Sequence, residues 1–174
     1  MLDFVQGFIE IDPITITFMV DLVVAVILGV LIGGERELRN KDAGISTHTF
    51  VICGAMLFTF MSMTVDPASK SRIAAQIVSG IGFLGAGLIL KDGTTVRNLT
   101  TAASIWFAGA IGMAIGFGFH QIAIVAALAS IVIPRIPHVR KEKRVLYSTD
   151  DGAEVGLKRD SGNNDVVGAP ISDD

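Results

Sequence analysis

The sequence has few of the features that stabilise small secreted or soluble proteins. Its 174 residues include one cysteine, Cys53, which excludes an internal disulfide framework and favours a small buried residue over a redox thiol. Charged residues make up 18% of the chain and hydrophobic residues 51%, which leaves too little polar surface for a soluble domain of this length. The N-terminal stretch carries Asp3, Glu10 and Asp12 but no Lys or Arg, so it lacks the basic start of a signal peptide.

The residue sets that usually carry catalysis are also missing. The sequence offers no Ser-His-Asp set, no HExxH and no phosphate-binding loop, so we expect no enzymatic activity and no cofactor. Gly80, Gly82 and Gly85 fit a dinucleotide-binding spacing only loosely, and they lie inside an apolar run rather than after a strand. We expect the partners to be the lipid bilayer and other membrane proteins, and not nucleic acid.

The chain instead contains five apolar segments that can be compared with the roughly 20 residues a helix needs to cross a bilayer. The second and fifth are short, so their ends must lie in the interface or the bilayer must thin around them. The sequence therefore predicts an all-α membrane protein with five transmembrane helices packed around a glycine-rich third helix. The segments run over about Ile14–Gly33, Thr49–Thr64, Ile73–Leu90, Ala102–Phe117 and Gln121–Pro134.

Residues 1–134 form the predicted transmembrane domain, and residues 135–174 form a polar tail that is first basic and then acidic. We expect the tail to be disordered from about residue 150. The loops after the first and third segments, together with the start of the tail, hold ten Lys and Arg, whereas the opposite side holds only Lys70 and Arg72. The positive-inside rule therefore predicts an outside N-terminus and a cytoplasmic C-terminus.

Small residues mark where the helices are expected to touch, because helices in lipid associate through close packing. The third segment carries glycine on nearly every side, which is hard to place against lipid and suggests a central helix. The same faces can serve packing within one chain, a homo-oligomer, or a backbone exposed to a permeating solute. The predicted packing residues are Gly29, Gly33, Ser79, Gly80, Gly82, Gly85, Gly87, Gly112 and Gly116.

A polar cluster is expected at the cytoplasmic end of the first segment. Glu35 and Arg36 lie against the hydrocarbon, where desolvation strengthens ion pairing. Arg97 can reach back to Glu35, and the hydroxyls of Thr100 and Thr101 join the cluster. The alternative is a helix end that pairs with itself through Glu35 and Arg39 at positions i and i+4.

Asp21 is a carboxylate about 10 Å down the first segment, where an ionised group costs roughly 2.5–3.5 kcal/mol. It is a candidate functional residue, or it forms a hydrogen bond with a neighbour such as Gln76 or Ser79. No second buried carboxylate offers an oxygen-rich metal cage, but partly hydrated Mg²⁺ needs only one or two, so a magnesium site stays open.

Two stretches resemble the MgtC/SapB family of bacterial inner-membrane proteins. The first is LVVAVILGVLIGGER, from Leu22 to Arg36; the second is RIAAQIVSGIGFLGAG, from Arg72 to Gly87. Val96-Arg97, Leu99, Thr101-Ala102-Ala103 and Trp106 continue the likeness. Position by position, the residues of this chain that fall on the family's motif are Glu35, Arg36, Gln76, Gly80, Gly82, Gly85, Gly87, Arg97 and Thr101. Asn98 stands where the family usually has glycine.

The resemblance implies five spans and a role in growth at low magnesium or survival inside macrophages. It also implies regulation of another membrane complex, with the proton-driven ATP synthase as a proposed target. We therefore expect a non-enzymatic regulator; the alternatives are a small, oligomeric Mg²⁺ or other cation transporter, and a stress protein acting on lipid or membrane potential. The oligomeric state stays open.

Overall fold

A computed structural model describes residues 12–65, 69, 72–93, 95–136, 145–148 and 155–158, the last two ranges as backbone only. The chain divides into two compact units, Met1–Ile136 and Pro137–Asp174.

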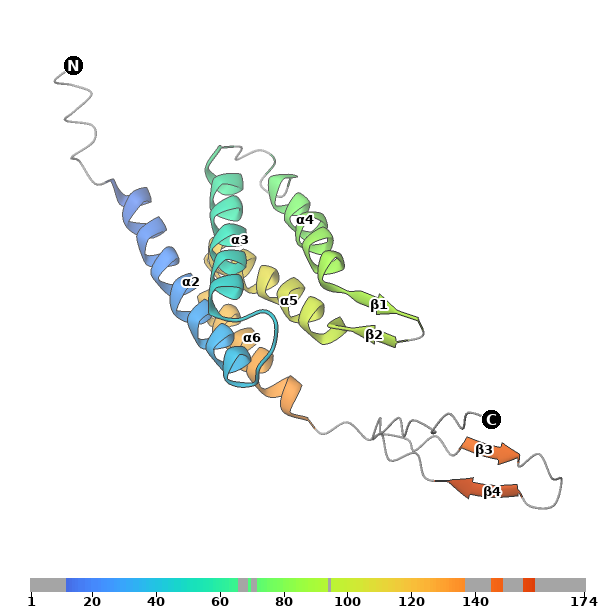
Figure 1. Cartoon of the computed structure of the whole chain (residues 1–174). Coiled ribbons are helices and arrows are strands. Elements are labelled where there is room, and N and C mark those ends of the chain that lie inside the picture. The colour runs from blue at the N-terminus through green and yellow to red at the C-terminus, as the bar shows by residue number, and fades with distance from the viewer. Residues whose placement is uncertain are drawn as a thin grey trace, which may run out of the picture. The chain divides into compact units, whose positions relative to one another are not determined.

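Within its described residues, the first unit consists of five α-helices and one short hairpin (Figure 1). This confirms the five predicted helices. Three of them, of 26, 21 and 18 residues, are long and apolar enough to cross a membrane: α2, α3 and α5. The other two are shorter apolar helices, so five complete spans stay a prediction. The bounds are α2 Pro13–Leu38, α3 Ile45–Val65, α4 Arg72–Leu88, α5 Leu99–Gly116 and α6 His120–Val132, with a 3₁₀ turn η1 at Ile133–Arg135.

Local sequence signals explain where α2 and α5 begin. Pro13 occupies the first turn of α2, and the Asp12 carboxylate caps it by accepting a 2.7 Å hydrogen bond from the Thr15 backbone N–H. Hydrogen bonds from Thr15 also hold the pKa of the Asp12 carboxyl below its ordinary value. Before α5, Asn98 adopts a left-handed conformation with φ of 64°. Asparagine and glycine both tolerate this region, which explains why Asn98 can replace the usual glycine.

The arrangement of the helices does not confirm α4 as the central helix. Helix α3 packs against α2, α5 and α4, while α5 packs against α3, α4, α6 and α2. Helix α4 lies to one side and contacts α3 and α5, as Figure 1 shows. The middle of the unit is therefore the α3–α5 pair, although each of these helices carries fewer glycines than α4.

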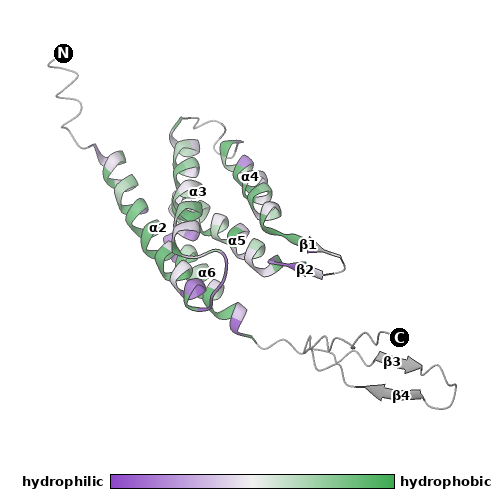
Figure 2. Cartoon of the chain, in the orientation of Figure 1, coloured by the Kyte–Doolittle hydropathy of each residue, from purple (hydrophilic) through white to green (hydrophobic). Residues whose placement is uncertain are grey.

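The core of the first unit lies where α2, α3, α5 and α6 meet, and all of its members are apolar. It buries one face of each helix, whereas the hydrophobic residues on the outer faces stay exposed, as expected for a surface that meets lipid. Figure 2 shows the apolar colouring along these helices. The buried residues are Ala25, Leu28, Ile32, Ile52, Met56, Ala108, Ile111, Ile115, Ala123 and Ala127.

Glycines in α2 and α5 allow the helix backbones to approach closely, as predicted for packing positions. A Cβ on Gly29 would lie 2.6 Å from the Thr49 Cα, and a Cβ on Gly116 would lie 2.6 Å from the Met56 carbonyl oxygen. Gly33 meets the backbone of α3 at Ile45 in the same way, and Gly112 meets it at Ile52. Gly85 makes an ordinary contact with Ala102.

The glycines on the rest of α4 behave differently from these. A Cβ on Gly80, Gly82 or Gly87 would meet nothing within 4 Å, and Ser79 is exposed. These four predicted packing residues therefore make no close helix contact within the described chain.

Two short hairpins were not predicted. In the first unit, β1 (Leu90–Asp92) pairs antiparallel with β2 (Thr95–Arg97) between α4 and α5. In the second unit, β3 (Val145–Ser148) pairs antiparallel with β4 (Val155–Lys158). Strand β4 falls in the stretch predicted to be disordered, and β3 lies in the tail just before that stretch. The remaining residues of that stretch lie outside the described ranges.

Candidate functional site

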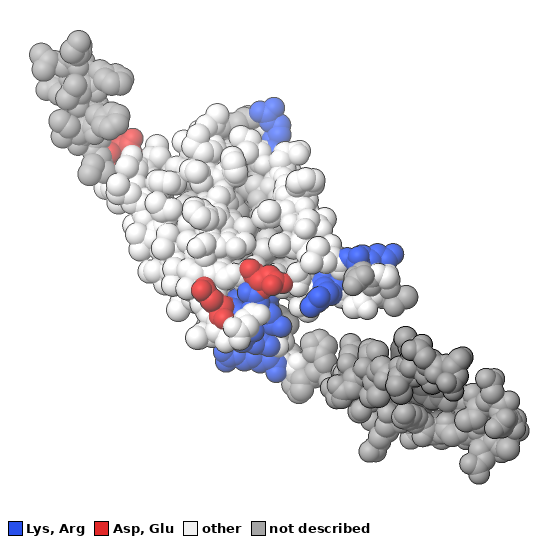
Figure 3. Space-filling model, viewed as in Figure 1, with Lys and Arg blue, Asp and Glu red and all other residues white. Residues whose placement is uncertain are grey.

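Charged side chains occupy the two ends of the helical unit, and an uncharged belt separates them on the face shown in Figure 3. One end contains the C-terminus of α2, the N-terminus of α3, the β1–β2 hairpin and η1; we call it the Arg36 end. The other contains the N-terminus of α2 and the α5–α6 turn; we call it the Asp21 end. Each end contains a buried ionisable residue held by a partner from a distant part of the chain.

Arg36 is the central residue at the Arg36 end. Its side chain is buried among α2, α3 and α5, with only 2% of the residue exposed. Its Nη2 donates a 2.8 Å hydrogen bond to the Thr101 hydroxyl oxygen, and Thr101 is equally buried. The Arg36 Nε is buried without a hydrogen-bond partner, and no carboxylate among the described residues lies within ion-pair distance. A buried cation held by one neutral hydroxyl is poorly compensated, which makes the Thr101 bond important.

Two residues of α3 extend this polar cluster. His48 is fully buried; its Nδ1 lies 3.1 Å from the Gly44 carbonyl oxygen and its Nε2 lies 3.3 Å from the Ser104 hydroxyl. The Thr49 hydroxyl oxygen is buried and has no hydrogen-bond partner among the residues that the structure describes. Because Ser104 and Thr101 both lie on α5, the cluster joins α2, α3 and α5 through side chains as well as through apolar packing.

Glu35 forms a second set of contacts at the Arg36 end, but not with the predicted partner Arg97. Its Oε1 accepts from the Arg39 Nη1 and from the Arg135 Nε, both at 3.4 Å. Arg39 also donates a 3.1 Å bond to the Pro134 carbonyl oxygen, so α2 is joined to η1. The expectation that Arg97 reaches back to Glu35 is wrong, because β2 holds Arg97 on an exposed hairpin. The predicted pairing within the helix end, between Glu35 and Arg39, is present.

The other two candidates of the predicted cluster lie apart from it. Thr100 is exposed at the start of α5, because it lies one residue before the buried Thr101 and so faces another side of the helix. Gln76 is exposed on α4 and lines a groove against α3. The structure therefore brings together Glu35, Arg36 and Thr101, and separates Gln76, Arg97 and Thr100 from them.

At the Asp21 end, a contact between a carboxylate and an imidazole joins α2 to α6. The Asp21 Oδ1 lies 2.6 Å from the His120 Nε2. The Asp21 side chain is 3% exposed and the His120 side chain 37% exposed, so solvent can reach the pair from the histidine side. The hydrogen bond expected from Gln76 or Ser79 is absent, because both side chains lie on the exposed face of α4. Among the described residues, no group of three His, Cys, Asp or Glu could hold a metal ion.

Sequence reasoning missed His120, although a signal for it was present. A carboxylate inside an apolar helix needs a partner, and from Ala102 to Pro134 His120 is the only ionisable side chain. Arg135 was counted only as a basic residue that sets the topology. Nothing in the sequence indicated that it would share Glu35 with Arg39.

Most of the helical unit is similar to proteins of a known family. The MgtC family model matches residues 22–140. The chain is 48% identical over 111 residues to Protein MgtC of Salmonella typhimurium strain LT2, which covers 64% of this chain and 48% of the relative.

A second relative, Protein MgtC of Brucella abortus strain 2308, is 48% identical over 110 residues, which covers 63% of this chain and 46% of the relative. The chain thus spans about half the length of the curated relatives it matches. No solved structure matches. The family model covers most of the helical unit, including Glu35, Arg36, Thr101 and His120, and the chain belongs to the MgtC family.

Proposed function

We propose that this chain is a non-enzymatic protein of the bacterial inner membrane that regulates another membrane complex during growth at low magnesium or under intracellular stress. The resemblance of its two motifs to the MgtC/SapB family supports this role, and an ATP-synthase-like complex is the partner that the resemblance implies. Self-association into a homo-oligomer is compatible with the exposed small residues of α4.

The proposed topology has five spans, with the N-terminus outside and the Arg36 end in the cytoplasm. The end of α2, the β1–β2 hairpin and η1 lie at one end of the helical unit (Figure 1), and their cations support this orientation: Arg36, Arg39, Lys41, Lys91, Arg97 and Arg135. Helices α4 and α6 are short for a span, and η1 adds one turn to the end of α6.

The observation that favours regulation over transport is the apolar core between the Asp21 end and the Arg36 end. Asp21 and Glu35 are fourteen residues apart on α2, which corresponds to about 21 Å. Buried Ala25, Leu28 and Ile32 occupy the side of α2 between them, and Ile52, Met56 and Ile111 pack opposite. A route for a hydrated cation needs polar groups along its length, and this interior provides apolar ones.

Transport of Mg²⁺ or another cation is the alternative, and the buried Asp21 carboxylate is the observation in its favour. The two functions are separated by assaying the purified full-length chain in liposomes for Mg²⁺ flux, with Asp21→Asn, Glu35→Gln and, as the matched control, Thr100→Val. In parallel, the chain is purified from mildly solubilised membranes and its co-purifying proteins are identified.

If the chain is a regulator, we expect Mg²⁺ flux no higher than in empty liposomes. We also expect a membrane complex that co-purifies with the chain in a constant molar ratio. Flux that the control retains and the Asp21 and Glu35 variants lose would show that the chain is a transporter.

A further inference from the structure

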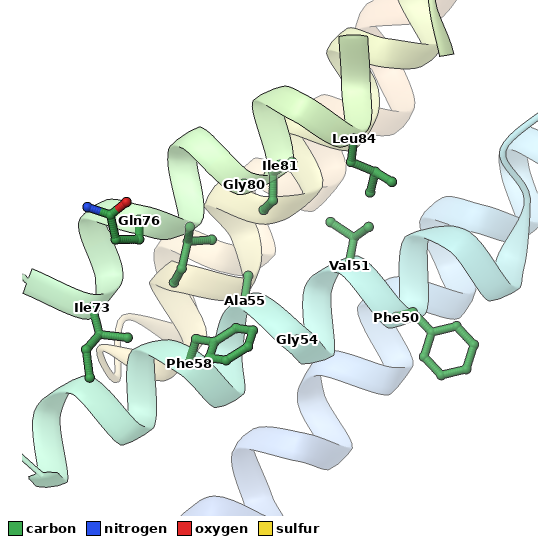
Figure 4. Close-up of a pocket in the computed structure, with 11 residues that line it drawn as sticks. Phe50, Val51, Gly54, Ala55, Phe58, Ile73, Gln76, Gly80, Ile81 and Leu84 are labelled. Atoms are coloured by element: carbon green, nitrogen blue, oxygen red, sulfur yellow. The ribbon is translucent and has the colours of Figure 1, made fainter. Parts of the chain in front are cut away.

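A groove runs between α3 and α4 on the side of the helical unit away from α2 (Figure 4). Its volume is about 520 Å³. Residues of α3 form one wall, including Phe50, Gly54 and Phe58, and residues of α4 form the other, from Ile73 to Leu84. Apart from the Gln76 amide, every lining side chain is apolar or is absent, as at the glycines.

The length and chemistry of the groove indicate its occupant. From Ile73 to Leu84 the α4 wall is about 17 Å long. An extended hydrocarbon chain can lie along such a wall, and it needs no polar partner from the apolar lining.

Two glycines keep this passage open without serving the packing of the chain. A Cβ on Gly54 or on Gly80 would meet nothing within 4 Å. This contrasts with Gly33 and Gly112, where a Cβ would strike the α3 backbone. The absence of side chains at Gly54 and Gly80 therefore creates space that the described chain does not fill.

Positive charge lies beyond the Leu84 end of the groove. Helix α4 ends at Leu88, one turn after Leu84, and the β1–β2 hairpin follows with Lys91 and Arg97 both exposed. On the proposed topology these cations lie at the level of the lipid headgroups, where each one attracts an anionic headgroup.

We propose that the α3–α4 groove is a binding site for one anionic phospholipid, with an acyl chain along the groove and the headgroup phosphate near Lys91 and Arg97. The proposal rests on α4 lying in the bilayer, as in the topology above, but it requires neither the regulated complex nor the absence of transport. A lipid held there covers the Gly54 and Gly80 backbones and shields this side of α4 from protein contacts.

The test is native mass spectrometry of the purified full-length chain with added phosphatidylglycerol or phosphatidylcholine of identical acyl chains. We expect one phosphatidylglycerol to be retained in preference to phosphatidylcholine. In Gly80→Leu and Gly54→Leu its retention should fall roughly tenfold, which corresponds to about two methylene groups losing their contacts. In the double variant Lys91→Gln/Arg97→Gln, the preference for phosphatidylglycerol over phosphatidylcholine should fall roughly fivefold for each cation removed.

Gly82→Leu is the matched control, because a Cβ there also meets nothing within 4 Å but Gly82 does not line the groove. It should retain phosphatidylglycerol as the unmodified chain does. Equal retention in the Gly80 variant and in the control would overturn the proposal. A second result would also overturn it: Gly80→Leu leaves lipid retention unchanged but abolishes chemical cross-linking of α4 to a helix of another protein molecule. The groove would then hold protein. Neither result depends on the flux or co-purification experiments.

Discussion

The glycines of α2 and α5 and those of α4 differ in what surrounds them. Gly33 and Gly112 lie where two helix backbones touch, and a single added carbon would strike α3. Gly80 and Gly82 lie on α4 with open space around them. In sequence the two groups look alike, and the α4 group is the denser. The number of glycines in an apolar segment therefore does not identify the helix with the most neighbours. Glycine also occurs on helix surfaces that no other helix covers.

Adding a methyl group to one glycine of each group tests this difference by its effect on stability. Gly112→Ala should cost about 3 kcal/mol, because the Cβ strikes the Ile52 carbonyl oxygen, which cannot move aside. Gly82→Ala should stabilise the chain by up to about 1 kcal/mol through helix propensity. Unfolding of both variants in mixed micelles measures the difference. Similar midpoints for the two would show that α5 does not approach α3 as closely as described.

A second prediction compares the partners of the buried cation at the Arg36 end. Thr101→Val should cost about 2 kcal/mol, because it leaves the Arg36 guanidinium buried without its hydroxyl acceptor. Arg36→Met should cost less, since an apolar side chain of similar length removes the charge together with its desolvation cost. The double variant should be about as stable as Arg36→Met alone. A double variant as unstable as the sum of the two single changes would exclude this coupling.

The Asp21 end provides a third prediction, with a smaller effect because solvent reaches His120. His120→Leu should cost about 1–2 kcal/mol, since it leaves the buried Asp21 carboxylate without its partner. Asp21→Asn should be milder, because the amide can still form a hydrogen bond with the imidazole. A thermal melt of each variant at pH 7 in the same detergent checks this order. Gln121→Leu, at an exposed neighbouring position, is the control and should melt as the unmodified chain does.

The smallest expected effect lies at the turn before α5. Asn98→Gly should leave stability within about 0.5 kcal/mol, because glycine adopts the left-handed conformation freely. Asn98→Ala should cost about 1 kcal/mol, because alanine has a Cβ but lacks the short polar side chain that lets asparagine adopt the left-handed conformation. Unfolding midpoints that are equal for the two variants would contradict the left-handed turn.

Much of the fold followed from the sequence because each helix is a long apolar run. All five predicted segments overlap a helix, and the errors lie at the ends, where α2 continues past Gly33 to Leu38 and α3 begins at Ile45 rather than near Thr49. Those extra turns are polar or mixed, so an apolar pattern does not mark them. The β1–β2 hairpin has strands of three residues, too short to give a periodic signal.

The candidate site was predictable only in part. Glu35, Arg36 and Thr101 were expected to cluster because charges and hydroxyls at one membrane boundary seek partners there. Which atoms pair depends on the rotation of each helix about its axis, and an apolar segment with similar residues on all sides does not determine that rotation. For this reason Arg36 rather than Glu35 meets α5, and Glu35 is held by Arg135 instead of Arg97.

The contacts that join α2 to α6 and to η1 have a consequence for biosynthesis. Asp21 is paired with a residue 99 positions later, and Glu35 shares its carboxylate with a residue 100 positions later. At about 5–20 residues per second, α2 leaves the ribosome about 5–20 s before either partner exists. During that interval the Asp21 carboxylate lacks its hydrogen-bonding partner His120. A nascent chain stalled before His120 should therefore be a better substrate for membrane proteases than the finished protein.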